Sequence, residues 1–360
     1  MKKPNRRFIT NLCTYLMVII AFIVCRSMIG AGTMSRSMKG QLVPICAYIV
    51  MAISLNLTVG ISGELSLGHA GFMSIGAFSG IIFAGWLRAV VPDVSNEVRL
   101  FLAILVGGAF ALVAGFLIGI PVLRLRGDYL AIVTLAFGEI IRSLLNLCYF
   151  WLDDGHLRFS FGSSPDPAIK YLFNGPAGAQ NVAKIPTETG FVGGFILVLA
   201  ALFVVLNLIG SRSGRAIMAA RDNRIAAESV GVNITKYKMM AFTVSACLAG
   251  MAGALFGLNY STLQSVKFNV DASIQVLVFV VLGGIGNIWG SIISAALLYV
   301  LPEMLRTFST YRMLIYAIVL IIVMIVTNLP LVRSFVTQLS NASERRRMNR
   351  DSKTRKGDAV

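Results

Sequence analysis

Charged residues are scarce in this chain of 360 residues, where they account for 13% of the sequence while hydrophobic residues account for 56%. Soluble domains average about 25% charged and 45–50% apolar residues, so this composition excludes an ordinary soluble domain. Apolar runs of roughly 20 residues, the length that crosses a bilayer, recur along the whole chain. Because these runs are continuous rather than alternating with polar residues, they also argue against a β-barrel. The composition predicts an all-α fold, a polytopic transmembrane helical bundle.

Acidic residues are scarcer than basic ones: 16 Asp and Glu stand against 32 Lys and Arg, which gives a net charge of +16. Such an excess can indicate nucleic-acid binding, but its distribution here does not. The basic residues cluster before the first apolar run, within residues 212–238 and within residues 333–356. Clusters that flank apolar spans are typical of cytoplasmic loops. We therefore expect a protein embedded in a lipid bilayer and no nucleic-acid partner.

Residues that build metal sites and active sites are also few. The chain has two histidines, His69 and His156, and five cysteines that all fall in apolar segments. None of them shows the spacing of a metal site. The nucleotide-binding motif G-x-x-x-x-G-K-[ST] is missing, because no glycine in the chain is followed by lysine. The sequence predicts a protein that is not an enzyme, binds no metal and holds no cofactor itself.

Ten apolar segments have the length expected of membrane spans. They lie at residues 8–25, 42–59, 72–87, 100–123, 129–150, 191–209 and 239–260, at two short stretches within 274–301, and at 314–329. An even number of spans places both termini on one side, and the basic clusters make that side cytoplasmic. A re-entrant pair within 274–301 is the alternative, and it would move the C-terminal tail outside.

The domain organisation follows from this topology. Residues 1–40 hold the N-terminal tail, the first span and a loop; residues 41–330 form the transmembrane domain; and residues 331–360 are a basic cytoplasmic tail. Within the domain, residues 151–189 carry three basic and four acidic residues, which predicts an external segment. Residues 211–238 carry six basic and two acidic residues, which predicts a cytoplasmic loop.

Two glycine-rich stretches, at residues 60–71 and 283–290, interrupt the apolar character. Broken helices expose backbone groups, which a membrane tolerates only against protein or a water-filled cavity. Paired breaks in the two halves of a transporter point to a binding site, whereas close helix packing through small residues is the alternative. The sequence leaves both interpretations open. The glycines concerned are Gly60, Gly63, Gly68, Gly283, Gly284, Gly286 and Gly290.

The cytoplasmic loop contains the signals of a short helix. Asp222 can cap a helix start and Gly231 can end one, which predicts about two helical turns over residues 223–230. Ala226 and Ala227 are small, so a partner surface could approach this helix closely. The segment is either an exposed docking element along the membrane or a solvated loop that only sets topology.

The sequence AAESVG at residues 226–231 resembles the E-A-A-x-x-x-G coupling loop of ABC importer permeases, in a variant order found in one family. That family is the branched-chain amino acid importer permeases, specifically the larger of two paired membrane subunits. Three further segments are similar to its N-terminal, central and C-terminal signatures. They are SLNLTVGISGELSLGHAGFMSIGAF at 54–78, LRLRGDYLAIVTLAFGEIIRSL at 123–144 and VLVFVVLGGIGNIWGSIISAALLYVLPE at 276–303. The resemblance covers most of residues 41–330, and residues 151–173 depart from it.

The resemblance implies an ATP-driven importer in which this chain contributes to the membrane path. Its partners would be a second homologous permease subunit, two cytoplasmic ATPase subunits that use ATP and Mg²⁺, and an extracytoplasmic substrate-binding protein. The location would be a bacterial-type cytoplasmic (inner) membrane. Closure of the ATPases would push on the coupling helix and switch the spans between outward- and inward-open states. The residues expected at that contact are Arg215, Asp222, Ala226, Ala227, Glu228 and Gly231.

Ionisable residues also occur inside apolar spans. Glu139 lies ten residues into the span that begins at Tyr129, which is about 15 Å into a core about 30 Å thick. Arg142 and Asn146 follow on the same face. This stripe either lines the translocation path or is a mutually neutralised pair that stabilises the bundle. The candidate path residues are Asn56, Glu64, His69, Glu139, Arg142 and Asn146.

Branched-chain amino acids are the substrates that the resemblance implies. Urea or short amides are the alternative, since similar permeases carry them. An ion-coupled secondary transporter is an explanation of a different class, which would require its own coupling site and no ATPase. A membrane enzyme would require a catalytic cluster, and the sequence displays none.

Overall fold

The computed structural model describes residues 6–32, 34–125, 127–153, 156–162, 171–179, 184–305 and 311–328. Contacts divide the chain into two units, Met1–Val300 and Leu301–Val360. The helices are α1 (Arg6–Gly30), α2 (Arg36–Asn56), α3 (His69–Val90), α4 (Asn96–Val122), α5 (Asp128–Asn146), α6 (Thr187–Gly210), α7 (Arg212–Asp222), α8 (Arg224–Ser229), α9 (Ile234–Gly257), α10 (Val270–Gly283), α11 (Ile288–Met304) and α12 (Arg312–Asn328). The predicted basic tail at 331–360 lies outside the described residues.

The prediction of an all-α membrane protein is confirmed. Seven helices, namely α1 to α6 and α9, are long and apolar enough to cross a membrane. The helices α10, α11 and α12 have 14, 17 and 17 residues. Together these make ten candidate elements, as the sequence predicts, while the number that cross the whole bilayer stays a prediction.

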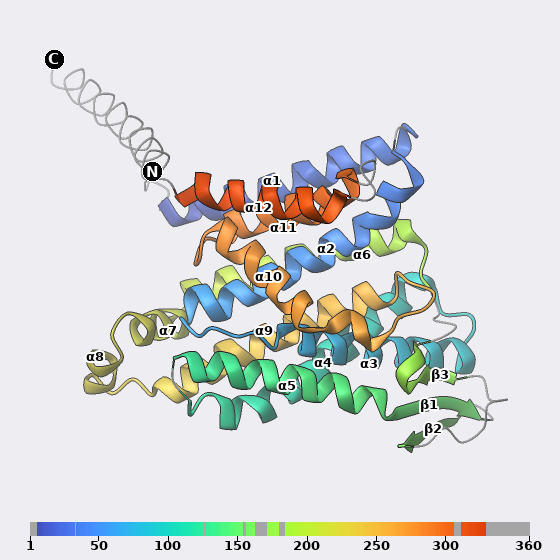
Figure 1. Cartoon of the computed structure of the whole chain (residues 1–360), viewed down its shortest axis with the longest axis horizontal. Helices are drawn as coiled ribbons and strands as arrows, with labels where there is room; N and C mark the ends of the chain where they lie inside the picture. The colour runs from blue at the N-terminus through green and yellow to red at the C-terminus, as the bar shows by residue number, and fades with distance from the viewer. Residues whose placement is uncertain are drawn as a thin grey trace, which may run out of the picture. The chain divides into compact units, whose positions relative to one another are not determined.

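Three helices, α3, α4 and α9, pack together closely within the first unit (Figure 1). A Cβ atom on Gly76 of α3 would lie 2.0 Å from the carbonyl oxygen of Gly250 on α9. A Cβ on Gly107 of α4 would lie 2.7 Å from the carbonyl oxygen of Gly76. Membrane helices associate through such small residues, because lipid supplies no hydrophobic drive between them. These glycines let the three backbones meet and form a base for the other helices.

The remaining helices of this unit attach to that base. α2 packs on α6, α9 and α10, while α5 packs on α3. Each of α4, α5 and α6 keeps an exposed apolar face, since only 22–33% of their most apolar windows is buried. These faces are available to lipid or to partner subunits.

A small antiparallel sheet follows α5, which hydropathy did not predict (Figure 1). Its strands are β1 (Cys148–Asp153), β2 (His156–Phe161), β3 (Tyr171–Asn174) and β4 (Gly178–Ala179), in the order β2-β1-β3-β4. Residues 148–150, which the sequence places in the fifth span, pair in β1 with Phe161, Ser160 and Phe159. The aromatic residues of β1 are apolar enough to extend a helical span on hydropathy, and only the strand pairing separates them from it.

Candidate functional site

The first glycine-rich stretch changes the path of α2 before α3 begins. Residues Leu57–Ile61 form a π-helical turn, and a non-helical segment leads on to Gly68. Gly63 has a φ of 74°, a conformation that favours glycine. We call residues 57–68 the first break. Single π-helical turns inside α-helices often mark functional sites.

The second glycine-rich stretch separates α10 from α11. Gly284 and Gly286 have φ values of 92° and 83°, so the chain turns sharply there. A Cβ on Gly290 would lie 1.8 Å from the carbonyl oxygen of Gly283, which shows how closely the two short helices approach each other. We call residues 284–287 the second break. The predicted interruption of this apolar stretch is confirmed.

The two breaks are in direct contact although more than 200 residues separate them in sequence. The backbone N–H of Gly286 donates to the Asn56 side-chain oxygen at 2.8 Å, and Asn56 Nδ2 donates to Ser291 Oγ at 2.9 Å. A Cβ on Gly60 would lie 2.3 Å from the Gly286 nitrogen. Asn56, which is fully buried, therefore joins the end of α2 to the start of α11. The sequence suggested pairing the breaks, and the tertiary structure places them together.

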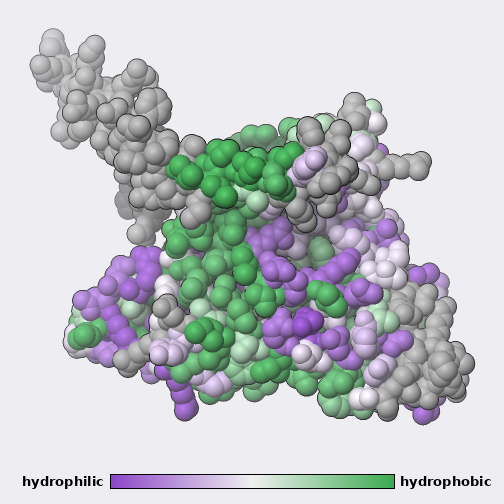
Figure 2. All heavy atoms as spheres, in the orientation of Figure 1, coloured by the Kyte–Doolittle hydropathy of each residue, from purple (hydrophilic) through white to green (hydrophobic). Residues whose placement is uncertain are grey.

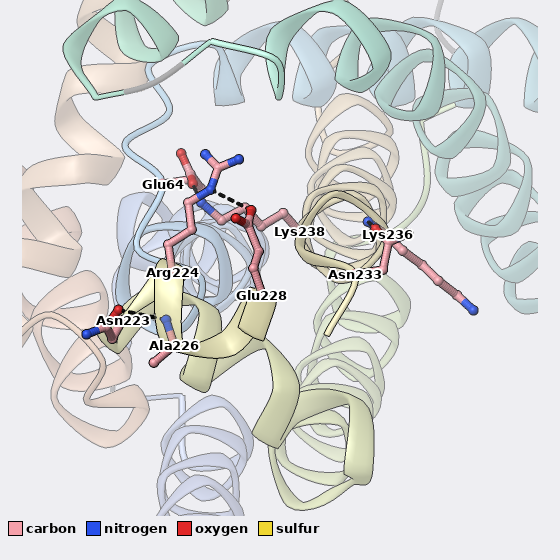
Figure 3. A network of polar contacts seen from close by, with 8 residues as sticks. All are labelled: Glu64, Asn223, Arg224, Ala226, Glu228, Asn233, Lys236 and Lys238. Carbon is pink, nitrogen blue, oxygen red and sulfur yellow. Dashed lines mark hydrogen bonds and ion pairs between the residues drawn. The ribbon is translucent and has the colours of Figure 1, made fainter. Parts of the chain in front are cut away.

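The cytoplasmic loop of the sequence analysis consists of two helices, α7 and α8 (Figure 1). The predicted cap at Asp222 is wrong: Asn223 caps α8, and its side-chain oxygen accepts from the Ala226 N–H at 3.1 Å (Figure 3). Asp222 is the last residue of α7 and pairs with Arg221. Asn223 adopts an extended conformation, φ −152° and ψ 104°, which an N-cap requires and Asp222 inside a helix does not have. The predicted stop at Gly231 is confirmed by its φ of 81°.

One side of helix α8 packs against the rest of the protein, and the other side is exposed. Ala227 is buried with Ala220 and Ile234, which come from α7 and α9. Arg224 and Glu228 form an ion pair at 3.0 Å along the helix surface. Ile225 and Val230 are 80% and 77% exposed, although both are apolar. The sequence analysis did not single out these two side chains, whose signal was their apolar character inside a polar loop.

Two contacts connect α7 and α9 to the first break. Arg221 at the end of α7 donates through Nη1 to the carbonyl oxygen of Gly60 at 2.8 Å. Lys238 in α9 forms an ion pair with Glu64, and both side chains are mostly buried. Figure 3 shows Glu64 and Lys238 beside Arg224 and Glu228 of α8. Sequence reasoning found Glu64 but missed Arg221 and Lys238, because their partners lie 161 and 174 residues away.

A cavity of about 250 Å³ lies at this junction. Its lining combines charged side chains with aliphatic ones: Ser62, Gly63, Glu64, Leu123, Leu125, Gly127, Ala220, Arg221, Arg224, Ile234, Thr235 and Lys238. The lining comes from the first break, the turn between α4 and α5, α7, α8 and α9.

His69 lies in a different environment from Glu64. Its ring is 1% exposed, and Nε2 lies 2.9 Å from Ser54 Oγ and 3.3 Å from Ser245 Oγ. Ser245 also donates to the backbone oxygen of Ser54 at 2.5 Å. This polar cluster joins α2, α3 and α9 inside the bundle, while His69 Nδ1 is buried without a hydrogen-bond partner among the described residues. The contacts of His69 favour its interpretation as a packing residue.

Glu139 and Arg142 form an ion pair on α5, with Arg142 Nη2 2.7 Å from Glu139 Oε2. Their side chains are 31% and 29% exposed. Asn146 accepts a hydrogen bond from Ser265 at the end of the same helix. The candidate path residues thus fall into separate groups: Asn56 at the breaks, Glu64 in the ion pair with Lys238, His69 in the bundle, and the other three along α5.

Comparison with known proteins gives this architecture a family. Residues 37–326 match the family described as branched-chain amino acid transport system / permease component. The chain belongs to this family of permeases. The match takes in all the helices from α3 to α11, the two breaks and the cytoplasmic helices. The predicted resemblance is therefore confirmed, and the chain is a multi-pass membrane permease.

Individual relatives agree with the family. The permease is 33% identical over 342 residues to the high-affinity branched-chain amino acid transport system permease protein LivM of Salmonella typhimurium, covering 87% of this chain and 72% of the relative. It is 25% identical to LivH of the same system in that organism, over 78% and 89% of the two chains. It is 22% identical to the fructose import permease protein FruG of Bifidobacterium longum, over 85% and 86%. No solved structure matches the permease.

Proposed function

We propose that this permease is one membrane subunit of an ATP-binding cassette importer that carries branched-chain amino acids. A second, homologous permease would complete the membrane path. Two cytoplasmic ATPase subunits would hydrolyse ATP with Mg²⁺, and an extracytoplasmic binding protein would deliver the substrate. The complex would lie in the cytoplasmic membrane with both termini of this chain in the cytoplasm. The relationship to LivM and LivH, two permeases named for one transport system, supports a paired arrangement.

The observation that carries the proposal is the connection between α8 and the first break. An ATPase that docks on α8 would press on a helix of six residues that is anchored through Ala227 to α7 and α9. Those two helices reach the first break through Arg221 and Lys238. Movement of α8 would therefore reach a broken helix inside the membrane through two direct contacts, as coupling by a two-state element requires.

Ile225 and Val230 supply the surface for the ATPase. These two exposed apolar side chains lie on or next to α8, where a docked subunit would cover them. Both residues point away from the bundle, so their replacement removes little packing within this chain. Glu228 and Arg224 border this apolar pair and would orient the docked subunit by charge.

The experiment that tests the coupling role compares two charge reversals. Glu228→Lys breaks the ion pair with Arg224 and places two positive charges one helical turn apart, so we expect transport to be abolished while the protein remains in the membrane. The matched control is Lys236→Glu, an exposed charge in the first turn of α9 outside α8, which should transport normally. Normal ATPase co-purification and normal uptake with Glu228→Lys would refute the coupling role.

The energy source is tested by reconstitution. The importer should take up leucine in proteoliposomes only when the second permease, the ATPases, the binding protein and ATP are all present. Uptake by this chain alone, driven by an ion gradient, would establish a secondary transporter instead. Competition by urea, short amides or fructose in the same assay identifies the substrate class. Fructose is a necessary control because a fructose import permease is among the relatives.

A further inference from the structure

We propose that the outward face of α5 is the surface on which the second permease subunit docks. This inference rests on the proposed function for the existence of that subunit. The face is a stripe of exposed residues at helical spacing: Tyr129, Ile132, Ala136, Ile140 and Leu144. Their spacing of three or four residues places them along one side of the helix. We call this stripe the α5 face.

The opposite side of α5 is occupied by this chain. The hydroxyl of Thr134 accepts from the Leu67 N–H at 3.0 Å, and a Cβ on Gly68 would lie 2.2 Å from the Thr134 carbonyl oxygen. A Cβ on Gly71 of α3 would lie 2.9 Å from Gly138 Cα. Helix α5 is therefore held against the first break and the start of α3. The α5 face is turned away from them and has room for another protein.

The Glu139–Arg142 ion pair decides what can cover this face. The pair lies in the middle of the span Tyr129–Asn146, and about a third of each side chain is exposed. Glu139 is seven residues, or two turns, after Ile132, so the pair borders the stripe. An exposed ion pair at this depth is unfavourable against hydrocarbon, and such groups normally face protein or a water-filled cavity. Lipid is therefore excluded as the sole covering of the α5 face.

Helix α4 shows what a lipid-facing surface looks like in the same chain. Residues 101–120 of α4 contain no charged or hydrogen-bonding side chain. Phe110, Phe116 and Leu117 are 58%, 49% and 61% exposed there. This surface suits hydrocarbon and needs no protein partner. The two helices thus differ in chemistry, although both are only partly buried.

The occupant of the α5 face has to reach the middle of the membrane, which excludes the ATPases and the binding protein. It must also offer polar groups to the ion pair, which a second permease with its own interrupted helices can provide. The first break touches the opposite side of the same helix, where Gly68 meets Thr134, so α5 lies between the break and the α5 face. A permease docked there would be separated by this one helix from the element that Arg221 and Lys238 contact.

The surface of the molecule agrees with this assignment. Figure 2 views the side that carries α5 in Figure 1, and hydrophilic residues lie among hydrophobic ones across its centre. A face turned wholly to lipid would be continuously apolar at that depth. We therefore assign this side to the contact between the two permeases.

Site-directed crosslinking in the assembled transporter tests the proposal. Single cysteines replace Ile132 and Ile140 on α5, or Phe110 and Leu117 on α4, in a chain whose five native cysteines are replaced by serine or alanine. Membranes that contain all subunits are treated with a benzophenone maleimide, which bonds to the introduced thiol at one end and, on illumination, inserts into a C–H bond of the neighbouring chain at the other. We expect Ile132→Cys and Ile140→Cys to link to the second permease at least tenfold more than the α4 variants. Ala136→Cys probes the same face if either α5 variant fails to accumulate.

Three outcomes would overturn the assignment. They are links to the second permease from α4 but not α5, no link from any α5 position, and links from α5 to another copy of this chain. ATP-dependent uptake by the same membranes tests the proposed function separately. Uptake without α5 crosslinks overturns the docking surface alone, whereas α5 crosslinks without uptake overturn the transport function and support the surface.

Discussion

Replacing Gly60 by alanine tests whether contact between the two breaks organises the membrane interior. An added Cβ would lie 2.0 Å from Asn56 Oδ1, 2.3 Å from the Gly286 nitrogen and 2.7 Å from Gly286 Cα. Two of these three atoms belong to the backbone, so no side-chain rotation can relieve the clash. The second break would have to move by about 1 Å, which would also break the hydrogen bond from Gly286 to Asn56.

The expected loss in free energy of unfolding is the sum of these two effects. Overpacking a close contact costs about 1–3 kcal/mol, and leaving the buried Gly286 N–H without an acceptor costs about 1–3 kcal/mol more. We therefore expect Gly60→Ala to lower the free energy of unfolding by roughly 2–6 kcal/mol. Each kcal/mol shifts the melting temperature by about 2–4 °C in domains of 150–250 residues, so a fall of roughly 4–24 °C is expected here.

The assay is thermal unfolding of the purified transporter in detergent, together with ATP-dependent leucine uptake. Gly40→Ala is the matched control, since Gly40 lies in α2, the helix that leads into the first break, and nothing is within 4 Å of its added Cβ. Alanine there should leave the melting temperature unchanged or raise it, because alanine favours a helix by about 1 kcal/mol over glycine. If Gly60→Ala melts and transports like Gly40→Ala, the contact between the breaks has no structural role.

Two further predictions concern the Glu64–Lys238 and Glu139–Arg142 ion pairs. Lys238→Met leaves the mostly buried Glu64 without its partner, which should lower the free energy of unfolding by roughly 3–5 kcal/mol. Adding Glu64→Gln should recover most of the lost melting temperature. A double variant as unstable as the single one would contradict this pairing. Glu139→Gln should reduce leucine uptake more than complex assembly, because it leaves the Arg142 charge unpaired at mid-membrane. Adding Arg142→Gln should restore assembly but not uptake if the pair serves the path, whereas full restoration of uptake would make the pair purely structural.

The local signals were reliable where a single segment determines its own structure. Continuous apolar runs predict α-helices that can cross a bilayer, and positive-φ glycines such as Gly231 end helices without reference to the rest of the chain. The capping residue of α8 was predicted one position too early, because Asp222 and Asn223 are both good caps. Only the backbone conformation distinguishes them: Asp222 is still helical, while Asn223 is extended.

Hydropathy could not find the sheet. The residues of β1 are apolar enough to prolong a membrane span, and their strand character comes from pairing with β2 and β3. Hydropathy also could not predict that Ile225 and Val230 are exposed, since the hydropathy of a residue in a short polar segment does not say whether its side chain is buried. In both cases the neighbours in space, and not in sequence, determine the outcome.

The sequence by itself determined the membrane location, the helical class, the two interruptions at glycine and the short helix α8, because each depends on residues within one turn or one span. Only the tertiary structure decided that the interruptions meet through Asn56 and Gly286, and that Arg221 of α7 and Lys238 of α9 contact the first break. These partners lie 161 to 230 residues apart. Hydrogen bonds and ion pairs over such separations form only after the helices have packed, so a one-dimensional pattern does not encode them.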